Sequence, residues 1–423
     1  MSKYAFILGR NPALSVAEII SVFKRDDISF QIVDSSDEVL LIKTDKTLDS
    51  KLILNGLGGT IKIGQIISSL DLDKSEAQIY QIFSAENLFL NLFAKRKGKI
   101  HFGISLYLLD KESNLRKNYR QLLENISSTI KKQLQQSGQS GGFLRIKDRF
   151  LSSVSVDKND LLTKGAEIIL LISKDRLYIA KTLSVQEYES YSSRDYGRPV
   201  RDTRSGMLPP KLAKIMLNLS LKKKRDTILD PFCGSGTIIT EAALMGFTHI
   251  LGSDIKNEAV KATLTNLNWL KNQYSHQSSD LQVKVFPSDI NDISSKIAPH
   301  STDAIITEPY LGPPFTRTPD EREIISTLNQ LASLYRNSFI QYSKIIKSNG
   351  RVVIIFPAFR LKGQLRLIDI LTELSGLGFY KVDILPPDQI QKYTSFLSGR
   401  KTPIYGRGDE FIAREILIFD YLK

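Results

Sequence analysis

The segment D-P-F-C-G-S-G-T at residues 230–237 has residue types and spacing that could bind a small charged ligand, and it stands between a strand pattern and a helix pattern. Glycines at such a turn let the backbone approach a ligand closely, and the first N–H groups of the following helix can meet a carboxylate. Ile239 occupies the third glycine position of the fuller phosphate-binding pattern G-x-G-x-x-G. We therefore expect Asp230, at the strand end, to meet the amino or carboxylate end of an amino acid moiety rather than a pyrophosphate.

Two more aspartates follow at the ends of strand patterns. Asp254 closes H-I-L-G-S-D-I at the distance from Asp230 where dinucleotide-binding folds place an acidic residue on ribose hydroxyls. A surface aspartate that merely ends a strand is the alternative. Asp289, in F-P-S-D-I, could accept a hydrogen bond from an adenine amino group, or it could cap a helix, and both can hold together.

The tetrapeptide T-E-P-Y at residues 307–310 ends a fourth strand pattern, where active sites of open α/β sheets lie. An amine whose lone pair is delocalised into a base is a poor nucleophile, so its methylation needs a proton acceptor and tight alignment. Glu308 with a neighbouring backbone carbonyl could hold such an amine, Pro309 belongs to the same loop, and Tyr310 offers a flat surface for the base. A proline-rich loop without catalytic function is the alternative.

Alternating strand and helix patterns after residue 211 must position these residues. Such alternation predicts a mostly parallel sheet covered on both faces, with a long helix from about Glu321 to Lys347. Residues 185–210 are polar, with aromatic residues and arginines interleaved and three prolines, and by composition they predict a linker.

The first 184 residues predict two smaller α+β units, at 1–55 and 56–184. A strand is expected in Y-A-F-I-L-G, followed by a helix with Ser15 as its N-cap. The second unit should contain a strand at 99–109, an amphipathic helix at 119–136, and short strands in F-L-R-I and S-S-V-S-V.

Composition excludes several classes of protein. The chain has 423 residues, 42 % of them hydrophobic, which predicts several cores, and its apolar runs are shorter than the roughly 18 residues of a membrane span. One cysteine and four histidines provide neither an intramolecular disulfide nor zinc-ligand spacing, and the first residues lack a secretory pattern. We therefore expect a cytoplasmic protein without a metal.

The formal charge of +13 suits a polyanionic partner, although a positive excess that only aids solubility is the alternative. Basic clusters stand before the catalytic motifs, at Lys95–Lys99, Lys131 and Lys132, Arg145–Arg149, and Lys222–Arg225. Four clusters in the half without chemistry favour contacts to phosphates.

From residue 230 onward the chain resembles class I methyltransferases that modify exocyclic amines, whose fourth-strand motif is Asp or Asn, Pro, Pro, and Tyr or Phe. Nearly the whole chain resembles the family of tRNA guanosine-10 N2-methyltransferases, through Y-A-F-I-L-G-R-N-P-A-L-S-V-A-E-I, Y-S-S-R-D-Y-G-R-P-V-R-D-T-R-S-G-M-L-P-P-K-L-A and Y-G-R-G-D-E-F-I-A-R-E-I-L-I-F. The resemblance implies a ferredoxin-like region at 1–55, a THUMP RNA-binding domain at 56–184, the linker at 185–210, and a Rossmann-like domain at 211–423 that uses S-adenosylmethionine.

One position departs from the motif of that family. Glu308 replaces the Asp, Pro309 is retained, Tyr310 falls on the second Pro, and Leu311 falls on the aromatic residue. The base is then stacked by Tyr310 from one position earlier or is held differently. The side chain of Glu also reaches about one methylene further than that of Asp, so the loop must shift.

The resemblance also assigns the linker, because residues 204–209 match the segment beside the methionine moiety of the cofactor. The residues assigned to the cofactor are Asp230, Phe232, Gly234, Gly236, Thr237, Asp254, Ile255, Asp289, Ile290, Met207 and Leu208. The residues assigned to catalysis are Glu308, Pro309 and Tyr310. The residues assigned to RNA are Lys95, Arg96, Lys97, Arg145, Lys147, Tyr191, Arg194 and Arg198, through phosphate pairing and stacking.

The function predicted is transfer of a methyl group from S-adenosylmethionine to the N2 amine of a guanosine in tRNA, at position 10, after the base is flipped outward. The alternatives are an N6-adenine methyltransferase acting on RNA or DNA, and a non-catalytic RNA-binding protein that keeps the fold. A monomer is expected, and the need for a small activating subunit stays open.

Overall fold

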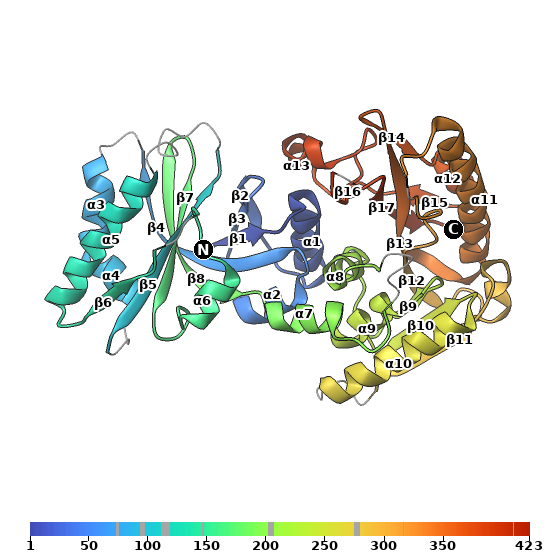
Figure 1. Cartoon of the computed structure of the whole chain (residues 1–423), viewed down its shortest axis with the longest axis horizontal. Coiled ribbons are helices and arrows are strands. Elements are labelled where there is room, and N and C mark those ends of the chain that lie inside the picture. Colours follow the sequence, from blue (N-terminus) through green and yellow to red (C-terminus); the bar gives the residue numbers. More distant parts are fainter. Residues whose placement is uncertain are drawn as a thin grey trace. The chain divides into compact units, whose positions relative to one another are not determined.

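The computed structural model of the protein describes residues 1–72, 76–93, 98–110, 119–145, 148–201, 207–274, 280–315, 317–408 and 410–423 (Figure 1). Its backbone divides into unit 1, which is Met1–Val16 with Asp27–Tyr188, and unit 2, which is Ala17–Asp26 with Glu189–Lys423. Each unit is built on its own mixed sheet, and the predicted α/β fold class is confirmed. Among the described residues, no helix combines the length and apolarity that crossing a membrane requires.

The described strands of unit 1 form one sheet. They are β1 (Ser2–Leu8), β2 (Gln31–Ser35), β3 (Val39–Thr44), β4 (Thr60–Asp71), β5 (Ile100–Leu108), β6 (Gly141–Phe143), β7 (Ala166–Ile172) and β8 (Arg176–Val185), in the order β2-β3-β1-β4-β8-β7-β5-β6. β5 is parallel to β6 and β7. β4 pairs with both β1 and β8, so the segments predicted as separate units, 1–55 and 56–184, share this sheet.

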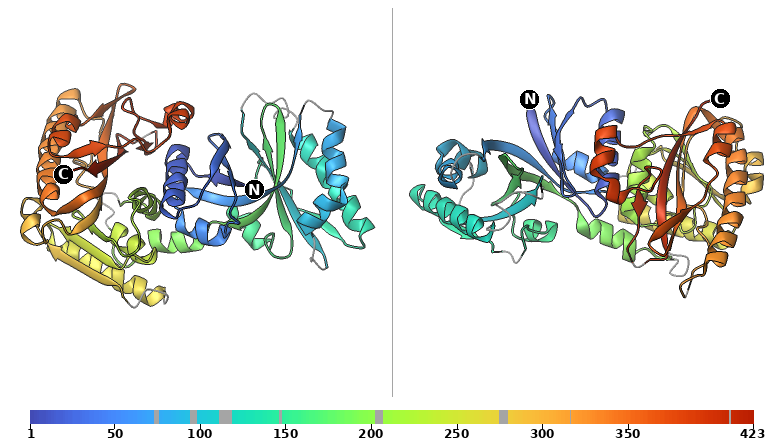
Figure 2. Two further views of the ribbon diagram at one scale, coloured as in Figure 1. Left: turned by 180° about the vertical axis from the view of Figure 1, so that it is seen from behind. Right: turned by 90° about the horizontal axis from the view of Figure 1, so that it is seen from above.

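Helices cover unit 1 because their apolar side chains repeat at helical spacing. They are α2 (Ser50–Gly56), α3 (Glu76–Ser84), α4 (Glu86–Phe93), α5 (Tyr119–Gln136) and α6 (Ser153–Lys158), while α1 (Pro12–Arg25) and α7 (Tyr188–Tyr196) have residues in both units. On α5, Leu122, Ile126, Ile130 and Leu134 recur every four residues and are buried with side chains of β5 and β7. This core holds α3, α4 and α5 against one end of the sheet (Figure 2).

Three local predictions in unit 1 are wrong. Of the strand predicted in F-L-R-I, only Phe143 belongs to a strand among the described residues, at the end of β6. Helix α1 already begins at Pro12, and Asn11 caps it by accepting a hydrogen bond from the Leu14 amide at 3.1 Å. The hydroxyl of Ser15 instead donates to the carbonyl oxygen of Gly59 at 2.7 Å. The segment S-S-V-S-V lies in α6 and not in a strand, because Ser152 accepts a hydrogen bond as the N-cap of that helix.

The described strands of unit 2 form a mixed sheet. They are β9 (Thr227–Asp230), β10 (His249–Asp254), β11 (Gln282–Pro287), β12 (Thr302–Thr307), β13 (Ile346–Leu361), β14 (Gln364–Leu367), β15 (Phe379–Lys381), β16 (Ile404–Tyr405) and β17 (Ile412–Tyr421). The main order is β11-β10-β9-β12-β13-β17-β15. The strands from β11 to β13 are parallel, as predicted, and β17 runs antiparallel between β13 and β15.

Helices and short 3-10 turns connect these strands. They are α8 (Pro210–Leu219), α9 (Thr237–Leu244), α10 (Asn257–Gln273), η2 (Ile290–Ser295), α11 (Glu321–Ile345), α12 (Leu371–Gly376), α13 (Pro387–Lys392) and η3 (Thr394–Phe396). Buried side chains of α11, such as Tyr335, Phe339 and Tyr342, pack on β13 and β17. In Figure 1, α8 and α9 lie on the other side of this sheet from α11. Asp320 and Glu323 form a capping box that starts α11.

The order of the strands places the candidate site. From β9 the chain runs outward through β10 and β11, and then returns to β12 on the other side of β9. Ligands of open α/β sheets bind outside the carboxyl ends of the strands at such a switch point. Asp230, Asp254 and Thr307 are the last residues of β9, β10 and β12, so the topology brings the predicted motifs to one edge.

A buried ion pair joins four strands of unit 1. Lys62 on β4 and Glu167 on β7 are 1 % and 0 % exposed, and their side chains meet at 2.5 Å. Glu167 also accepts from the hydroxyls of Ser105 on β5 and Thr182 on β8, at 2.5 and 2.7 Å. Burial lowers the pKa of Lys62 and Glu167 opposes that shift. Each partner therefore needs the other to remain inside the protein.

We expect Glu167→Gln to destabilise unit 1 by about 3–5 kcal/mol, because it leaves the Lys62 ammonium buried without its counter-charge. The free energy of opening, measured by hydrogen exchange of β4 and β8 in the full chain, checks this. Asp71→Asn is the matched control, since the pair Arg176–Asp71 also joins β4 and β8 but is exposed. Equal protection of β4 and β8 from hydrogen exchange in Glu167→Gln and Asp71→Asn would contradict the prediction.

Candidate active site at the carboxyl edge of the second sheet

The turn between β9 and α9 is built around two glycines in the left-handed backbone region. Gly234 has φ +52° and Gly236 has φ +84°. A Cβ added at Gly236 would lie 2.7 Å from Thr263, so close packing excludes a side chain there. A Cβ at Gly234 would meet no atom within 4 Å, so the backbone at this glycine faces open space. The turn therefore presents bare backbone at the start of α9, as a ligand-binding turn requires.

Asp254 holds this turn in place. One carboxylate oxygen accepts a hydrogen bond from the Gly234 amide at 3.0 Å, and the other accepts from the Lys256 amide at 3.0 Å. The Cys233 amide also donates to the Ser253 carbonyl at 2.8 Å, which ties the turn to the end of β10. Ile255, beside Asp254, is 65 % exposed. The structure thus brings Asp254 to the turn, while its contact to ribose hydroxyls stays a prediction.

Asp230 is buried at the end of β9. The Thr307 hydroxyl donates to its Oδ1 at 2.7 Å, and the Phe232 amide donates to the same oxygen at 3.2 Å. Burial raises the pKa of Asp230 to about 7, and the charges of Asp254 and Glu308 act in the same direction. Asp230 can therefore change its charge near neutral pH, and a positive ligand would favour the ionised form.

Asp289 is the N-cap of η2, which is one of the two functions predicted for this residue. Its Oδ1 accepts from the Asn291 amide at 2.9 Å, and the neighbouring Ile290 is buried. A half-buried carboxylate can still accept a further hydrogen bond from a ligand. The cap is therefore confirmed, and the contact of Asp289 to an adenine amino group stays a prediction.

Glu308 follows β12 and is paired with an arginine from β17. Nε of Arg414 lies 2.5 Å from Oε1 of Glu308, and the two side chains are 16 % and 14 % exposed. Burial raises the pKa of Glu308, and Arg414 opposes that shift. Pro309 is buried, whereas Tyr310 is 56 % exposed, and the Tyr335 hydroxyl donates to its carbonyl at 2.9 Å. The loop is thus anchored at the Tyr310 carbonyl and leaves the Tyr310 ring exposed.

The linker reaches the same turn. One guanidinium nitrogen of Arg198 donates to the Thr237 hydroxyl at 2.7 Å, and another donates to Sδ of Met207 at 2.9 Å. Leu208 is buried. Of the segment predicted to lie beside the methionine moiety, residues 204–206 are outside the described part of the chain. The described part links Met207, through Arg198, to the first residue of α9.

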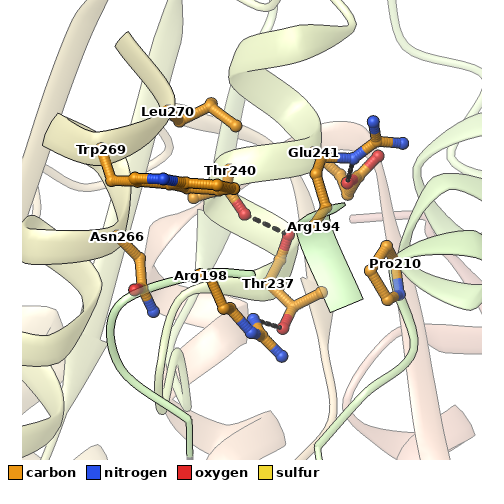
Figure 3. Close-up of a pocket in the computed structure, with 9 residues that line it drawn as sticks. All are labelled: Arg194, Arg198, Pro210, Thr237, Thr240, Glu241, Asn266, Trp269 and Leu270. Carbon is orange, nitrogen blue, oxygen red and sulfur yellow. Dashed lines mark hydrogen bonds and ion pairs between the residues drawn. The ribbon is translucent and has the colours of Figure 1, made fainter. Parts of the chain in front are cut away.

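The structure does not support three of the predicted RNA contacts. Tyr191, Arg194 and Arg198 are only 8 %, 6 % and 6 % exposed. Arg194 pairs with Glu241 on α9 at 2.6 Å, and Figure 3 shows both arginines turned toward α9 inside unit 2. Arg194 is paired with Glu241, and Arg198 contacts Thr237 and Met207, so these buried side chains are not placed to stack on bases or pair with phosphates as expected. The interleaved pattern of arginine and tyrosine belongs partly to a packed helix, α7, and not only to a linker.

The remaining predicted RNA contacts lie in unit 1. Arg145 is exposed, as a phosphate contact requires. Lys95, Arg96, Lys97 and Lys147 lie outside the described residues. These assignments stay predictions.

Sequence reasoning missed residues that support the site. Asn266 on α10 donates to the carbonyls of Val200 and Ser235 at 2.9 and 2.8 Å, so it joins the linker to the glycine turn. The Thr263 hydroxyl donates to the Gly234 carbonyl at 2.8 Å. Both residues lie in α10, and the sequence pattern of this helix would be the same if no site were present. Arg414 carried no signal either, because its partner is far away in the sequence.

The residues at this edge fit S-adenosylmethionine. Gly234 leaves room beside the backbone, and the first N–H groups of α9 can meet a carboxylate. The carboxylates of Asp230 and Asp254 suit the positive charges of the ligand, namely an ammonium and a sulfonium group. The close packing against Thr263 requires a residue without a side chain at Gly236, so the backbone of the turn stays uncovered there.

Comparison with known proteins gives matches to methyltransferases. A family model described as "RMKL-like, methyltransferase domain" matches residues 198–362, and one described as "DNA methylase" matches residues 77–265. A crystal structure of TrmN from Thermus thermophilus aligns over 99 % of this chain and 100 % of its own, with a TM-score of 0.52 and 13 % identity, which supports the fold alone.

Two curated relatives are archaeal. The tRNA (guanine(10)-N2)-dimethyltransferase of Methanocaldococcus jannaschii is 28 % identical over 250 residues, which are 58 % of this chain and 59 % of the relative. The chain thus spans about three fifths of the length of that relative. The probable tRNA (guanine(10)-N2)-dimethyltransferase of Methanothermococcus thermolithotrophicus is 31 % identical over 140 residues, which are 33 % of this chain and 82 % of that protein. Taken with the glycine turn and the motif that follows β12, these matches place the chain in the tRNA (guanine(10)-N2)-methyltransferase family.

Proposed function

We propose that the protein transfers a methyl group from S-adenosylmethionine to the exocyclic N2 amine of a guanosine in tRNA, at position 10. The observation that carries this proposal is the meeting of the glycine turn, Asp230 and Glu308 at one sheet edge. Membership of the family supports the choice of base and of RNA. Bound S-adenosylmethionine supplies an activated methyl group.

The residues at the edge would have separate functions. Gly234, Gly236 and Thr237 would hold the cofactor at the start of α9, with Asp230, Phe232 and Asp254 around its charged groups. Ile255, Asp289 and Ile290 would surround the adenosine, and Met207 and Leu208 would approach the methionine end. The assignment of the residues other than Met207 and Leu208 rests on their positions at or just after the carboxyl ends of β9, β10 and β11, and that of Met207 rests on Arg198, which contacts both Met207 and Thr237.

Glu308, Pro309 and Tyr310 would hold the reacting base. The Glu308 carboxylate would accept a hydrogen bond from the amine and favour the positive charge that develops on it. Tyr310 is exposed enough to stack on a base, which supports its proposed contact. A base paired within a folded tRNA would have to leave its stack before it could reach this loop.

Unit 1 would bind the RNA. This part of the proposal rests on the basic clusters at Lys95–Lys99, Lys131 and Lys132, and Arg145–Arg149, and on the exposure of Arg145. The correction at Tyr191, Arg194 and Arg198 removes three candidates from the linker, so the proposed contacts concentrate in unit 1.

Nucleoside mass spectrometry tests the proposed reaction. Unmodified tRNA is incubated with the full chain and S-adenosylmethionine that carries a labelled methyl group, and is then digested. Label in N2-methylguanosine is expected. Label in N6-methyladenosine would overturn the choice of base and support the adenine alternative. Cofactor binding without any labelled nucleoside would support the non-catalytic alternative.

We expect Gly234→Ala to weaken binding of S-adenosylmethionine by about tenfold or more, because the added methyl group enters the open space beside the turn. Calorimetry measures the affinity. Gly246→Ala is the matched control, since Gly246 also has positive φ, at +86°, and lies at the other end of α9. Both variants share the backbone strain, so equal affinities would exclude the ligand from the space at Gly234.

We expect Glu308→Gln to lower the single-turnover methylation rate by roughly 10²-fold or more, because the neutral amide keeps the shape but loses the charge. Affinity for S-adenosylmethionine should hardly change. Glu373→Gln is the control, since Glu373 also pairs with an arginine, Arg336, but on an exposed surface of unit 2. A Glu308→Gln variant as fast as this control would remove Glu308 from the reaction.

A further inference from the structure

The ion pair between Glu308 and Arg414 crosses a strand. Glu308 directly follows β12, Arg414 is on β17, and β13 lies between these two strands in the sheet. Pro357 is the residue of β13 opposite Arg414. Neighbouring strands of a sheet lie about 4.8 Å apart, so β12 and β17 are roughly 10 Å apart. Long side chains such as those of Arg and Glu can bridge that distance.

This geometry gives a physical reason for the departure from the family motif. The shorter Asp of that motif would end about one methylene earlier and would lose the 2.5 Å contact to Nε of Arg414. The extra length of the Glu308 side chain is therefore explained by its partner on β17, in addition to the shift of the loop. The aromatic residue and the acidic residue of T-E-P-Y then depart together from the usual pattern.

The described groups around Glu308 other than Arg414 are acidic, neutral or apolar. Asp230, at the end of β9, is another carboxyl group and interacts unfavourably with Glu308 when both are ionised. Tyr335 on α11 is buried and neutral, since burial raises its pKa well above the usual value. Residues 354–357 of β13 are apolar. Among the described groups that face Glu308, the positive charge comes from Arg414.

The next residue of β17, Glu415, forms its ion pair on the opposite face of the sheet. Glu415 is fully buried, and Arg400 pairs with it while also donating to the Ile368 carbonyl at 2.8 Å. Successive residues of a strand point to opposite faces, so Arg414 and Glu415 cannot exchange partners. Arg414 is thus directed to the side of Glu308.

We propose that Arg414 is a positioning residue of the active site, which fixes the direction of the Glu308 carboxylate and keeps it ionised beside Asp230. The proposal rests on the proposed methyl transfer for its effect on rate, but its electrostatic part concerns the folded chain alone. An arginine at this distance holds a carboxylate in one orientation and stabilises its charge. Without it, burial would favour the protonated carboxyl, which cannot accept the hydrogen bond of the amine with full strength.

The first test measures stability against pH in the full chain. In Arg414→Gln the pKa of Glu308 rises further, because burial acts without the opposing cation. A carboxyl group whose folded pKa is raised loses its stabilising contribution as pH rises through that value. The melting temperature of Arg414→Gln should therefore fall relative to the control as pH rises above the usual pKa range of a glutamate, and Glu308→Gln/Arg414→Gln should remove this dependence.

Arg351→Gln is the matched control. Arg351 on β13 pairs with Asp420 on β17 at 2.7 Å, and its side chain is as buried as that of Arg414, but it lies toward the other end of the same strand pair. If Arg414→Gln and Arg351→Gln show the same pH dependence of melting, Arg414 does not hold Glu308 ionised and the proposal fails.

The second test measures single-turnover methylation against pH. The acidic limb of the rate profile should move up by about one pH unit or more in Arg414→Gln, with an unchanged affinity for S-adenosylmethionine. Arg414→Lys should restore part of the rate, because it restores the charge without the planar contact. An unshifted profile would overturn the positioning role. A wild-type chain that methylates no nucleoside would instead refute the proposed function, and the melting series would still decide whether Arg414 keeps Glu308 charged.

Discussion

The negative charge gathered at the carboxyl edge of the unit 2 sheet is the constraint on which the site depends. Parallel strands bring Asp230, Asp254 and Glu308 to one edge, and burial there raises the pKa of Asp230 and of Glu308. Each carboxyl group is stabilised differently. Asp254 accepts backbone amides, Asp230 receives a hydroxyl and an amide and has its pKa raised to about 7, and Glu308 is paired with Arg414. A cationic ligand at this edge would relieve the remaining repulsion.

The linker is held at the same edge by hydrogen bonds to uncharged groups. Arg198 reaches the start of α9, and Asn266 joins Val200 to the glycine turn. Because α9 begins at that turn, a displacement of the linker would disturb the backbone that a cofactor would contact. Arg198, which the sequence assigned to RNA, therefore contacts the first residue of α9 instead.

Local patterns allowed the sequence to predict much of the fold and part of the site. The turn at 230–237 and the cap at Asp289 depend on neighbouring residues, so their types and spacing could be read directly. The parallel order of the strands then placed Asp254 and Glu308 at the same edge. Long-range contacts escaped this reasoning. Arg414 is 106 residues from Glu308, and Arg194 is 47 residues from Glu241, so no local pattern could announce either pair. The predicted cap at Ser15 is wrong for a local reason, because Asn11 caps a helix that already begins at Pro12.

The affinity for S-adenosylmethionine as a function of pH tests most directly whether the acidic edge receives the positive ligand. Since the pKa of Asp230 is about 7, its ionised fraction rises between pH 6 and pH 8, and the affinity of the wild-type chain should rise by roughly tenfold beyond that of Asp230→Asn. The Asp230→Asn variant is the reference, because its affinity changes with pH only through the titration of the ligand itself. The same pH dependence in both proteins would contradict the account.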